Sequence, residues 1–535
     1  MKIILSFSLL LLIVGLSATD YDWIWANRMG SVNGNDKAYR VETDALGNVY
    51  VTGDYTSIAS FGAFTLQPFG TNNTESDIFL AKYNPQGQCL WVTRAGSAWW
   101  DRSFALTIDP SGNVYISGMV TGYGPTIPLI YAYFGNSAFN LPYGYNIYVA
   151  KYDPNGTFLN LATAGPGSLA NSPITVQAMD ADSQGNVYVT GYYYNSVSFG
   201  ALTLTSQNSS YSCFIAKLGS SGSWQWVQKV DLPGDDSGTA IAVDATGVYV
   251  SGGSYGGGTM NGDNIPANGL YDVFVGKISL AGAWLWTKFY GSAGSDLGLG
   301  ICTDGDGTVY LSGYIGGTCN IGGVSISPYS GSTQNAFIAS LDTSGATLWA
   351  KALTCATTSS AGALARDGSN FVVTGMHGST LSFPPLAPVT GSGVYLARFD
   401  SSGTALNLDS VSITTPLPPS SVYANSSGGI YLTGAFSGTV NFGTQSITSS
   451  GNNDGYLAFR SPRQEIILDI ITLSPGELTL NWQYVAGASG YRIYAADNPE
   501  GEWDLLAEVG TSSNTYALGN PVQNRRFYKI TAITL

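Results

Sequence analysis

Charged side chains are scarce in this chain, and positive ones are the scarcer. Only 10% of the 535 residues are charged, and 35 Asp and Glu outnumber 21 Lys and Arg to give a formal charge of -14. A partner such as DNA or RNA needs a basic surface, and no cluster of Lys or Arg is visible. We therefore expect no nucleic-acid partner.

Histidine and cysteine are also rare. The single histidine, His377, excludes a metal site built on histidines, and no Gly-x-Ser-x-Gly motif accompanies it as a hydrolase triad would need. The five cysteines form no C-x-x-C pair, which argues against zinc or redox sites. Cys302 and Cys319 flank one predicted hairpin, but strand geometry would not place them opposite each other, so a disulfide there is the weaker expectation.

Long apolar runs are absent beyond the N-terminus. Residues 1–18 resemble a signal peptide: Lys2 precedes an apolar stretch from Ile3 to Leu16, and small residues follow up to Ala18. No later stretch approaches the ~20 apolar residues of a membrane span. We expect a secreted or cell-surface protein with no membrane insertion after cleavage; an uncleaved anchor is the lesser alternative.

Glycine and tyrosine are abundant, with 68 and 34 residues, and they belong to a repeated phrase. Asp44-Ala-Leu-Gly-Asn-Val-Tyr-Val-Thr-Gly53 recurs nearly unchanged at 109–118 and 182–191. Weaker copies end at Gly252, Gly313, Gly375 and Gly434, so seven copies lie 59 to 73 residues apart. Self-similarity at such a period indicates a repeat architecture.

Each repeat unit contains four predicted strands. An apolar strand ends at the Asp, a tight Asp-x-x-Gly turn follows, and Val-Tyr-Val-Thr-Gly forms the second strand. The third resembles Asp77-Ile-Phe-Leu-Ala-Lys-Tyr83, and the fourth carries a tryptophan in four units: Trp91, Trp226, Trp286 and Trp349. Four short strands with turn signals at each joint predict one blade of a β-propeller, and no helical periodicity competes.

The two ends of the array complement each other. The seventh unit lacks a fourth strand with tryptophan, while Trp23-Ile-Trp25 precedes the first unit with nothing before it. We predict that this N-terminal strand closes the last blade, which would remove the exposed edges of an open array. The predicted fold is all-β: a seven-bladed β-propeller over residues 19–462 plus a small β-sandwich over 463–535.

The repeat units resemble the SBBP-type β-propeller repeats of bacterial exported proteins. The resemblance covers roughly residues 22–460 and rests on the turn phrase and the Asp-x-Phe-x-Ala-Lys-Tyr strand; units 6 and 7 depart from it most. It implies a scaffold and no known reaction, because function belongs to sites and not to folds. The segment 463–535 resembles a fibronectin type III domain, with Trp482 as its core tryptophan and Tyr528, Ile530 and Ala532 in its penultimate strand. Its final strand is expected to be very short or absent.

Four aspartates precede the turn aspartate of their unit by eight residues: Asp36, Asp101, Asp236 and Asp296. Repeat geometry places them where one blade leads into the next. One interpretation is that each accepts backbone N–H groups and fixes the loop between blades. The other is a partial acidic ring that binds a cation such as calcium. No other cofactor is expected.

The strongest departure from the repeat is a group of aromatic residues in units 1 to 3. They could form an exposed surface for stacking on sugar rings or gripping a peptide, or the inserted loop of unit 2 could pack upon itself as a lid. The candidate ligand-binding residues are Trp99, Trp100, Arg102, Tyr123, Tyr131, Tyr133, Tyr143, Tyr145 and Tyr193.

These observations favour a secreted or surface-associated, non-catalytic binding scaffold for an extracellular glycan or protein. A carbohydrate-active hydrolase or lyase using carboxylates on the propeller face is one alternative, and convergent acids with raised pKa values in a deep cleft would favour it. A structural protein of the cell envelope or matrix is the other. The sequence names no catalytic residue.

Overall fold

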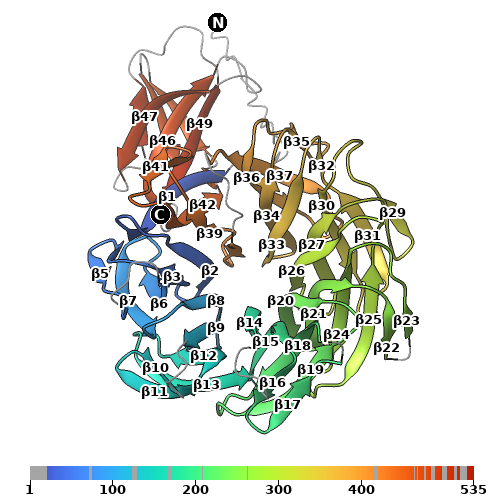
Figure 1. Cartoon of the computed structure of the whole chain (residues 1–535). Helices are drawn as coiled ribbons and strands as arrows, with labels where there is room; N and C mark the ends of the chain where they lie inside the picture. The colour runs from blue at the N-terminus through green and yellow to red at the C-terminus, as the bar shows by residue number, and fades with distance from the viewer. Residues whose placement is uncertain are drawn as a thin grey trace, which may run out of the picture.

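The computed structural model describes residues 21–535 apart from 71–74, 123–128, 167–171, 208, 262, 414–419, 463, 467, 475–476, 483–487, 497–502, 511–514, 519–526 and 535. Throughout this described part the regular elements are β-strands, and the chain contains no helix there (Figure 1). The strands form many small antiparallel sheets. Accordingly, no helix in the described residues could span a membrane.

The first repeat unit forms an antiparallel sheet from four strands in chain order. These are β2 (Lys37–Thr43), β3 (Val49–Tyr55), β6 (Asp77–Tyr83) and β7 (Cys89–Gly96). Every residue of β3 and β6 is buried, because the two middle strands have neighbouring sheets on both faces. Their β-branched and aromatic residues suit such a position.

Five further units repeat this order. Their strands are β8 (Asp101–Ile108), β9 (Val114–Gly122), β12 (Gly144–Tyr152) and β13 (Phe158–Pro166); β14 (Ile174–Ala181), β15 (Val187–Tyr194), β18 (Tyr211–Leu218) and β19 (Trp224–Val230); β20 (Asp236–Asp244), β21 (Gly247–Tyr255), β24 (Tyr271–Ile278) and β25 (Trp284–Tyr290); β26 (Leu297–Thr303), β27 (Val309–Ile315), β30 (Asn335–Leu341) and β31 (Thr347–Ala352); and β33 (Ser359–Asp367), β34 (Asn370–His377), β36 (Gly393–Phe399) and β37 (Ala405–Val411).

The last unit draws its fourth strand from the other end of the chain. It contains β38 (Ser421–Ala424), β39 (Ile430–Phe436) and β42 (Asp454–Pro462), and β1 (Tyr21–Ser31) pairs antiparallel with β42. The Arg28 guanidinium lies 2.7 Å from the Asp454 carboxylate across this pair. The N-terminal strand therefore occupies the position that the sequence predicted for it.

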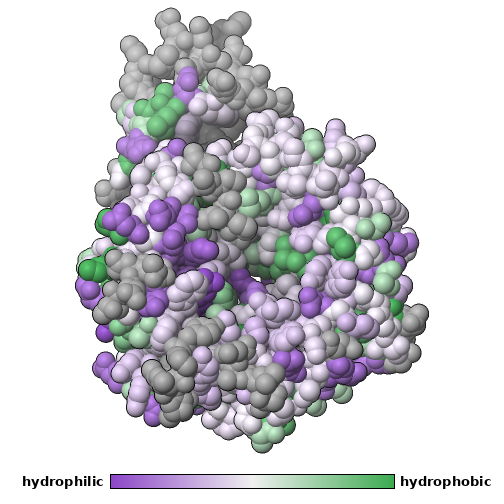
Figure 2. All heavy atoms as spheres, viewed as in Figure 1, coloured by the Kyte–Doolittle hydropathy of each residue, from purple (hydrophilic) through white to green (hydrophobic). Residues whose placement is uncertain are grey.

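The first strands of the units contact one another in a cycle. β2 contacts β8, the contacts continue through β14, β20, β26 and β33 to β38, and β38 contacts β2 again. Figure 1 shows these strands around a common centre, and Figure 2 shows a hollow there. Arg40 of β2 donates to Ser420 O at 2.6 Å and to Gln177 O on β14 at 3.2 Å, so one side chain ties three units together at the centre. The arrangement is consistent with a β-propeller.

Hairpins between the second and third strands cross to the preceding sheet. β4 (Ala59–Phe61) and β5 (Phe64–Leu66) extend the sheet of β1, β10 (Leu129–Phe134) and β11 (Ser137–Pro142) extend that of β7, and β16 (Ser196–Phe199) and β17 (Leu202–Thr205) extend that of β13. Each of these hairpins covers an outer edge that would otherwise be exposed. The equivalent hairpins β22 (Gly258–Met260)–β23 (Asp263–Ile265), β28 (Cys319–Ile321)–β29 (Val324–Ile326) and β40 (Thr439–Phe442)–β41 (Gln445–Thr448) form two-stranded sheets, as do β32 (Thr354–Cys355) and β35 (Leu381–Ser382).

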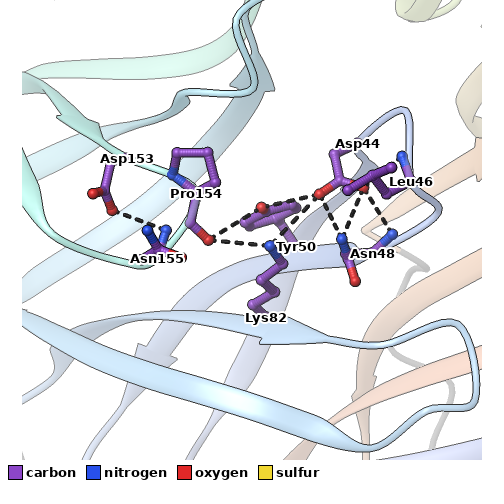
Figure 3. Close-up of polar contacts among 8 residues, drawn as sticks. All are labelled: Asp44, Leu46, Asn48, Tyr50, Lys82, Asp153, Pro154 and Asn155. Atoms are coloured by element: carbon purple, nitrogen blue, oxygen red, sulfur yellow. Dashed lines mark hydrogen bonds and ion pairs between the residues drawn. The ribbon is translucent and has the colours of Figure 1, made fainter.

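The repeated phrase is a network of hydrogen bonds (Figure 3). Asp44 Oδ1 accepts from the N–H groups of Leu46 and Asn48 at 3.0 and 2.9 Å, and the Tyr50 hydroxyl donates to Asp44 Oδ2. Lys82 Nζ lies 4.9 Å from the centre of the Tyr50 ring and donates at 3.1 Å to Pro154 O in the next unit. The Asp, Asn and Tyr of the phrase, together with the Lys of the third strand, thus fix both a turn and a neighbouring unit.

Tryptophans of the fourth strands pack on turn glycines of the following unit. A side-chain carbon built on these glycines would lie within about 3.1 Å of the indole ring, so only glycine fits: Gly87 under Trp25, Gly156 under Trp91, Gly282 under Trp226, Gly345 under Trp286 and Gly403 under Trp349. All five glycines have positive φ. Trp25 belongs to β1, so the N-terminal strand makes the same contact as fourth strands elsewhere.

The segment after residue 463 forms two further sheets. One has the order β43 (Gln464–Ile466), β49 (Phe527–Thr534), β46 (Ala488–Ala496), β47 (Asp504–Gly510); the other has β44 (Leu468–Ser474), β45 (Glu477–Trp482), β48 (Thr515–Leu518). Trp482, Tyr491, Ile493 and Ile530 share a core. β43 pairs antiparallel with β49 at the edge of the first of these sheets.

Candidate functional site

A cavity of about 620 Å³ opens beside the inserted hairpin of unit 2. It lies where β10 joins the outer edge of β7, and Tyr133 of β10 pairs with Gly96 of β7. The lining residues are Phe69, Arg94, Ala98, Tyr131, Tyr133, Gly135 and Asn136. Three separate segments of the chain therefore contribute: the loop before β6, the end of β7 with the loop after it, and β10 with its turn.

The two faces of β10 have different environments. Ala132 and Phe134 are fully buried, whereas Tyr131 and Tyr133 are 61% and 37% exposed. Side chains alternate along a strand, so one face of β10 packs toward unit 2, where Phe134 contacts Tyr148 and Phe158, while the other faces outward. The hairpin thus packs on the protein through one face and presents two tyrosines on the other.

Phe69 is the centre of a stack in this cavity. Its ring lies 5.2 Å from that of Tyr133, with the planes 15° apart, and the Arg94 guanidinium carbon lies 4.0 Å from its centre. Phe69 N donates to Asp77 Oδ2 at 2.6 Å, and Arg94 Nη1 donates to the carbonyls of Gln67 and Pro68. The loop that carries Phe69 is thus held from both sides.

Asp77 lies beneath this stack as a buried carboxyl. Burial raises its pKa to about 7, and the Phe69 N–H and the Arg94 charge oppose the rise. Among the described residues that line the cavity, Arg94 is the one charged side chain.

The loop with Trp99 and Trp100 borders the cavity through Ala98. Trp100 is 52% exposed, Trp99 is half-buried, and the Arg102 guanidinium carbon lies 6.0 Å from the Trp100 ring centre. Arg102 Nε lies 3.8 Å from Asp54 Oδ2. The tryptophan loop thus reaches the cavity of Tyr131 and Tyr133 through Ala98.

The other predicted aromatics are placed differently. Tyr193 is fully buried in the core of unit 3, and half-buried Tyr145 packs against the same core. Strand alternation explains the first result, because it turns Tyr192 and Tyr194 outward and Tyr193 inward. Tyr193 is therefore removed from the candidate surface. Tyr143 is half-buried, and Tyr123 lies outside the described residues.

Sequence reasoning missed Phe69, Arg94 and Asn136. Phe69 lies in an irregular loop, and Arg94 occupies a strand position that Lys229 holds in unit 3. Lys229 also donates to a backbone carbonyl, that of Thr205. Nothing in the sequence distinguishes Arg94 from this ordinary structural cation, so only the spatial stack on Phe69 identifies it.

The four aligned aspartates are buried and bind peptide N–H groups. They are 0–2% exposed. The N–H donors are Ser31 and Thr56 for Asp36, Ser97 and Thr121 for Asp101, Leu232 for Asp236, and Ser292 and Gly316 for Asp296. Among the described residues no group of three or more acidic, histidine or cysteine side chains could hold a metal ion. The geometry is that of the loop-fixing interpretation.

Burial raises the pKa of each of these four carboxyls. For Asp101 the negative charge of Asp77 adds to the rise, and for Asp36 that of Asp454 does so. The pKa of Asp236 rises to about 7. These are structural carboxyls, and burial rather than a reaction accounts for their pKa values.

Two acids approach each other at the centre of the ring. Burial raises the pKa of Glu42 well above its usual range, with a contribution from the charge of Asp180, and burial raises that of Asp180 to about 7. Both Asp180 oxygens accept N–H groups at 2.8 Å, from Ala181 and from Val243 of the next unit. Asp180 therefore links neighbouring strands.

His377 is buried and hydrogen-bonded, and the cysteines are free thiols. His377 is 1% exposed, and its ring nitrogens lie 2.7 Å from Ser379 O and Ser410 Oγ. Neither partner is a carboxylate, which a Ser-His-Asp triad would need. All five cysteines are free, including Cys302 and Cys319.

Comparisons with known proteins inform the fold more than the site. No family model matches the chain. An uncharacterized WD repeat-containing protein of Acanthamoeba polyphaga mimivirus is 23% identical over 326 residues, which are 56% of this chain and 19% of that protein. The match thus spans about a fifth of the relative's length. This likeness and the all-β repeats fit a β-propeller repeat protein.

Solved structures are only remotely similar. An apocarotenoid oxygenase of Synechocystis is 10% identical with a TM-score of 0.30, over 73% of this chain and 95% of that one. A glycoside hydrolase is 11% identical with a TM-score of 0.23, over 95% of both chains. At these scores neither structure says anything about the site.

Proposed function

We propose that this protein is a non-catalytic binding scaffold and that the cavity of Phe69, Tyr131 and Tyr133 takes an extracellular glycan. The observation that carries the proposal is the placement of two partly exposed tyrosines and a stacked phenylalanine around one cavity. Flat aromatic faces pack on the C–H faces of sugar rings, and the volume of about 620 Å³ lies in the range of ligand sites.

A glycan fits the cavity better than a folded protein partner. Standard protein interfaces are broad surfaces of about 800 Å² on each side, whereas this site is concave and built from a few residues. Exposed Asn136 and the hydroxyls of Tyr131 and Tyr133 offer polar groups for sugar hydroxyls. Binding of a folded protein in place of a glycan is the alternative that the experiment must distinguish.

Replacing the tyrosines tests this proposal. Tyr131→Ala and Tyr133→Ala should each weaken binding to any oligosaccharide that the parent retains on a glycan array, by roughly fivefold for a loss of about 1 kcal/mol of stacking. Isothermal titration of the array hits measures the change. Tyr329→Ala is the matched control, because Tyr329 is 49% exposed but does not line the cavity. If all three variants bind the oligosaccharide as tightly as the parent does, this cavity is not the binding site.

For the scaffold, we propose a closed seven-bladed propeller of the SBBP type, with β1 completing the last blade. Support comes from the cyclic contacts of the first strands and from the tryptophan and glycine pairs. The C-terminal segment is proposed as a fibronectin type III-like sandwich that acts as a spacer or docking module. Its two sheets and the Trp482 core support this assignment.

We place the mature protein outside the cell, secreted or at the surface. The support is the signal-like sequence of residues 1–18. An extracellular glycan would meet the cavity in that compartment. A full-length chain that stays in the cytoplasm of its own cell would remove this part of the proposal.

A further inference from the structure

The charge of the cavity separates possible sugars into two classes. The chain carries a formal charge of -14, yet the one charged residue that lines this cavity is the cation Arg94. An acidic protein would repel an anionic ligand at most of its surface, so a positive group in the candidate site is informative. The positive group indicates that the ligand of this cavity carries a negative charge.

Arg94 is held in place for recognition. Ala95, its neighbour on β7, is buried opposite Phe134, so strand alternation turns Arg94 to the outer face with Tyr133. The Phe69 ring lies against the guanidinium, and Nη1 donates to the Gln67 and Pro68 carbonyls. Both of these bonds use Nη1, and the Tyr55 hydroxyl is a further partner of the guanidinium.

The planar guanidinium, with five N–H donors of which Nη1 serves the two carbonyls, matches a planar carboxylate, which arginine can bind through two parallel hydrogen bonds. One arginine without a second cation suits a ligand with one charge per sugar. The tyrosines would hold the sugar ring while Arg94 holds its acid group. We infer that the cavity selects uronic acids, sugars that carry a carboxylate at C6, over their neutral counterparts.

This inference rests on the proposed function, and the experiment separates the two. Isothermal titration at low salt would compare tetragalacturonate with its fully methyl-esterified form, and tetramannuronate with its methyl ester. The esters keep the sugar rings and remove the charge. The wild-type protein should bind at least one free acid about tenfold or more tightly than its ester, and added salt should reduce the difference.

Variants identify the residue responsible. Arg94→Gln should abolish the preference, so that acid and ester bind equally, whereas Tyr133→Ala should weaken the binding of both and keep the preference. Arg94→Lys keeps the charge without the planar fork and should retain only part of the preference. Thermal melts would check that each variant is folded, since Arg94 also holds the loop of Phe69.

Each outcome is decisive. Equal binding of acid and ester by the wild-type protein, or a preference that Arg94→Gln retains, would overturn the uronate inference while the glycan proposal stands. Binding of sulfated tetragalactose in preference to the acids would overturn it too. If the wild type binds none of these probes and no glycan on the array, the proposed function fails with it.

Discussion

Aspartate has two opposite environments in this chain. Burial acts to raise the pKa values of turn aspartates such as Asp109 and Asp182, but the several hydrogen bonds that they accept outweigh it and lower those values. The aspartates beneath the loops, such as Asp77 and Asp236, are buried, and burial raises their pKa values to about 7. The same residue type thus favours the charged form in one place and the neutral form in the other.

The two groups predict a bell-shaped dependence of stability on pH. A buried acid with a raised pKa stabilises the fold in its neutral form, and that contribution decreases as the pH rises from about 4 to 7. A turn aspartate with a lowered pKa stabilises the fold when charged, and its contribution is lost as the pH falls below about 4. We expect the melting temperature to be highest near pH 4 and to fall toward pH 7, above which these groups add no further change.

One pair of variants separates the contributions. Asp236→Asn should flatten the decrease between about pH 4 and 7, because the neutral amide oxygen can still accept from Leu232 N. Asp109→Asn should instead lower the melting temperature at pH 7, because the amide cannot replace the charge beside Lys151. Parallel curves for the wild type and Asp236→Asn would contradict the assignment. Thermal melts by circular dichroism at each pH provide the measurement.

At the scale of elements, the contact between a fourth-strand tryptophan and the next turn connects neighbouring units. Trp25 packs on Gly87 and donates from Nε1 to Pro85 O at 3.0 Å. Trp286 packs on Gly345 in the same way and donates to Thr343 O at 3.1 Å. The only difference is that Trp25 reaches its sheet from the N-terminal strand.

This equivalence yields a prediction about β1. Trp25→Ala should destabilise the protein by about 3 kcal/mol, as expected for the loss of a large packed ring, and Trp286→Ala should have a similar effect. Urea unfolding of both variants measures the two losses. If the Trp25 variant unfolds with the wild type while the Trp286 variant does not, the N-terminal strand does not help to hold the ring.

The sequence predicted these elements well and the cavity only in part. Period and turn chemistry located the strands, the tryptophans and the fourth strand from the N-terminus, because these signals lie within a few residues of one another. The pairing of β10 with β7 is a contact between units, and it brought Phe69 and Arg94 to Tyr133. Tyr193 was misplaced because the inward side of a strand depends on its register, which three consecutive tyrosines do not reveal.

At the scale of the whole molecule, contacts between the first strands connect the units at the centre, whereas the outer hairpins differ from unit to unit. At the centre, Arg40 donates to backbone carbonyls of two other units, and Asp180 accepts a backbone N–H of the next unit, so these side chains connect the first strands. The outer hairpins vary in length, and the longest of them, β10–β11, forms the wall of the cavity. A binding site at the edge can change without disturbing the centre.

The most direct measurement of this account is hydrogen–deuterium exchange of the whole protein with and without its best oligosaccharide from the array. The account predicts slower exchange in peptides that contain residues 67–70, 94–98 and 129–142, with the centre of the ring and the C-terminal segment unchanged. Protection at the central strands or in residues 464–534, with none at the hairpin, would contradict it.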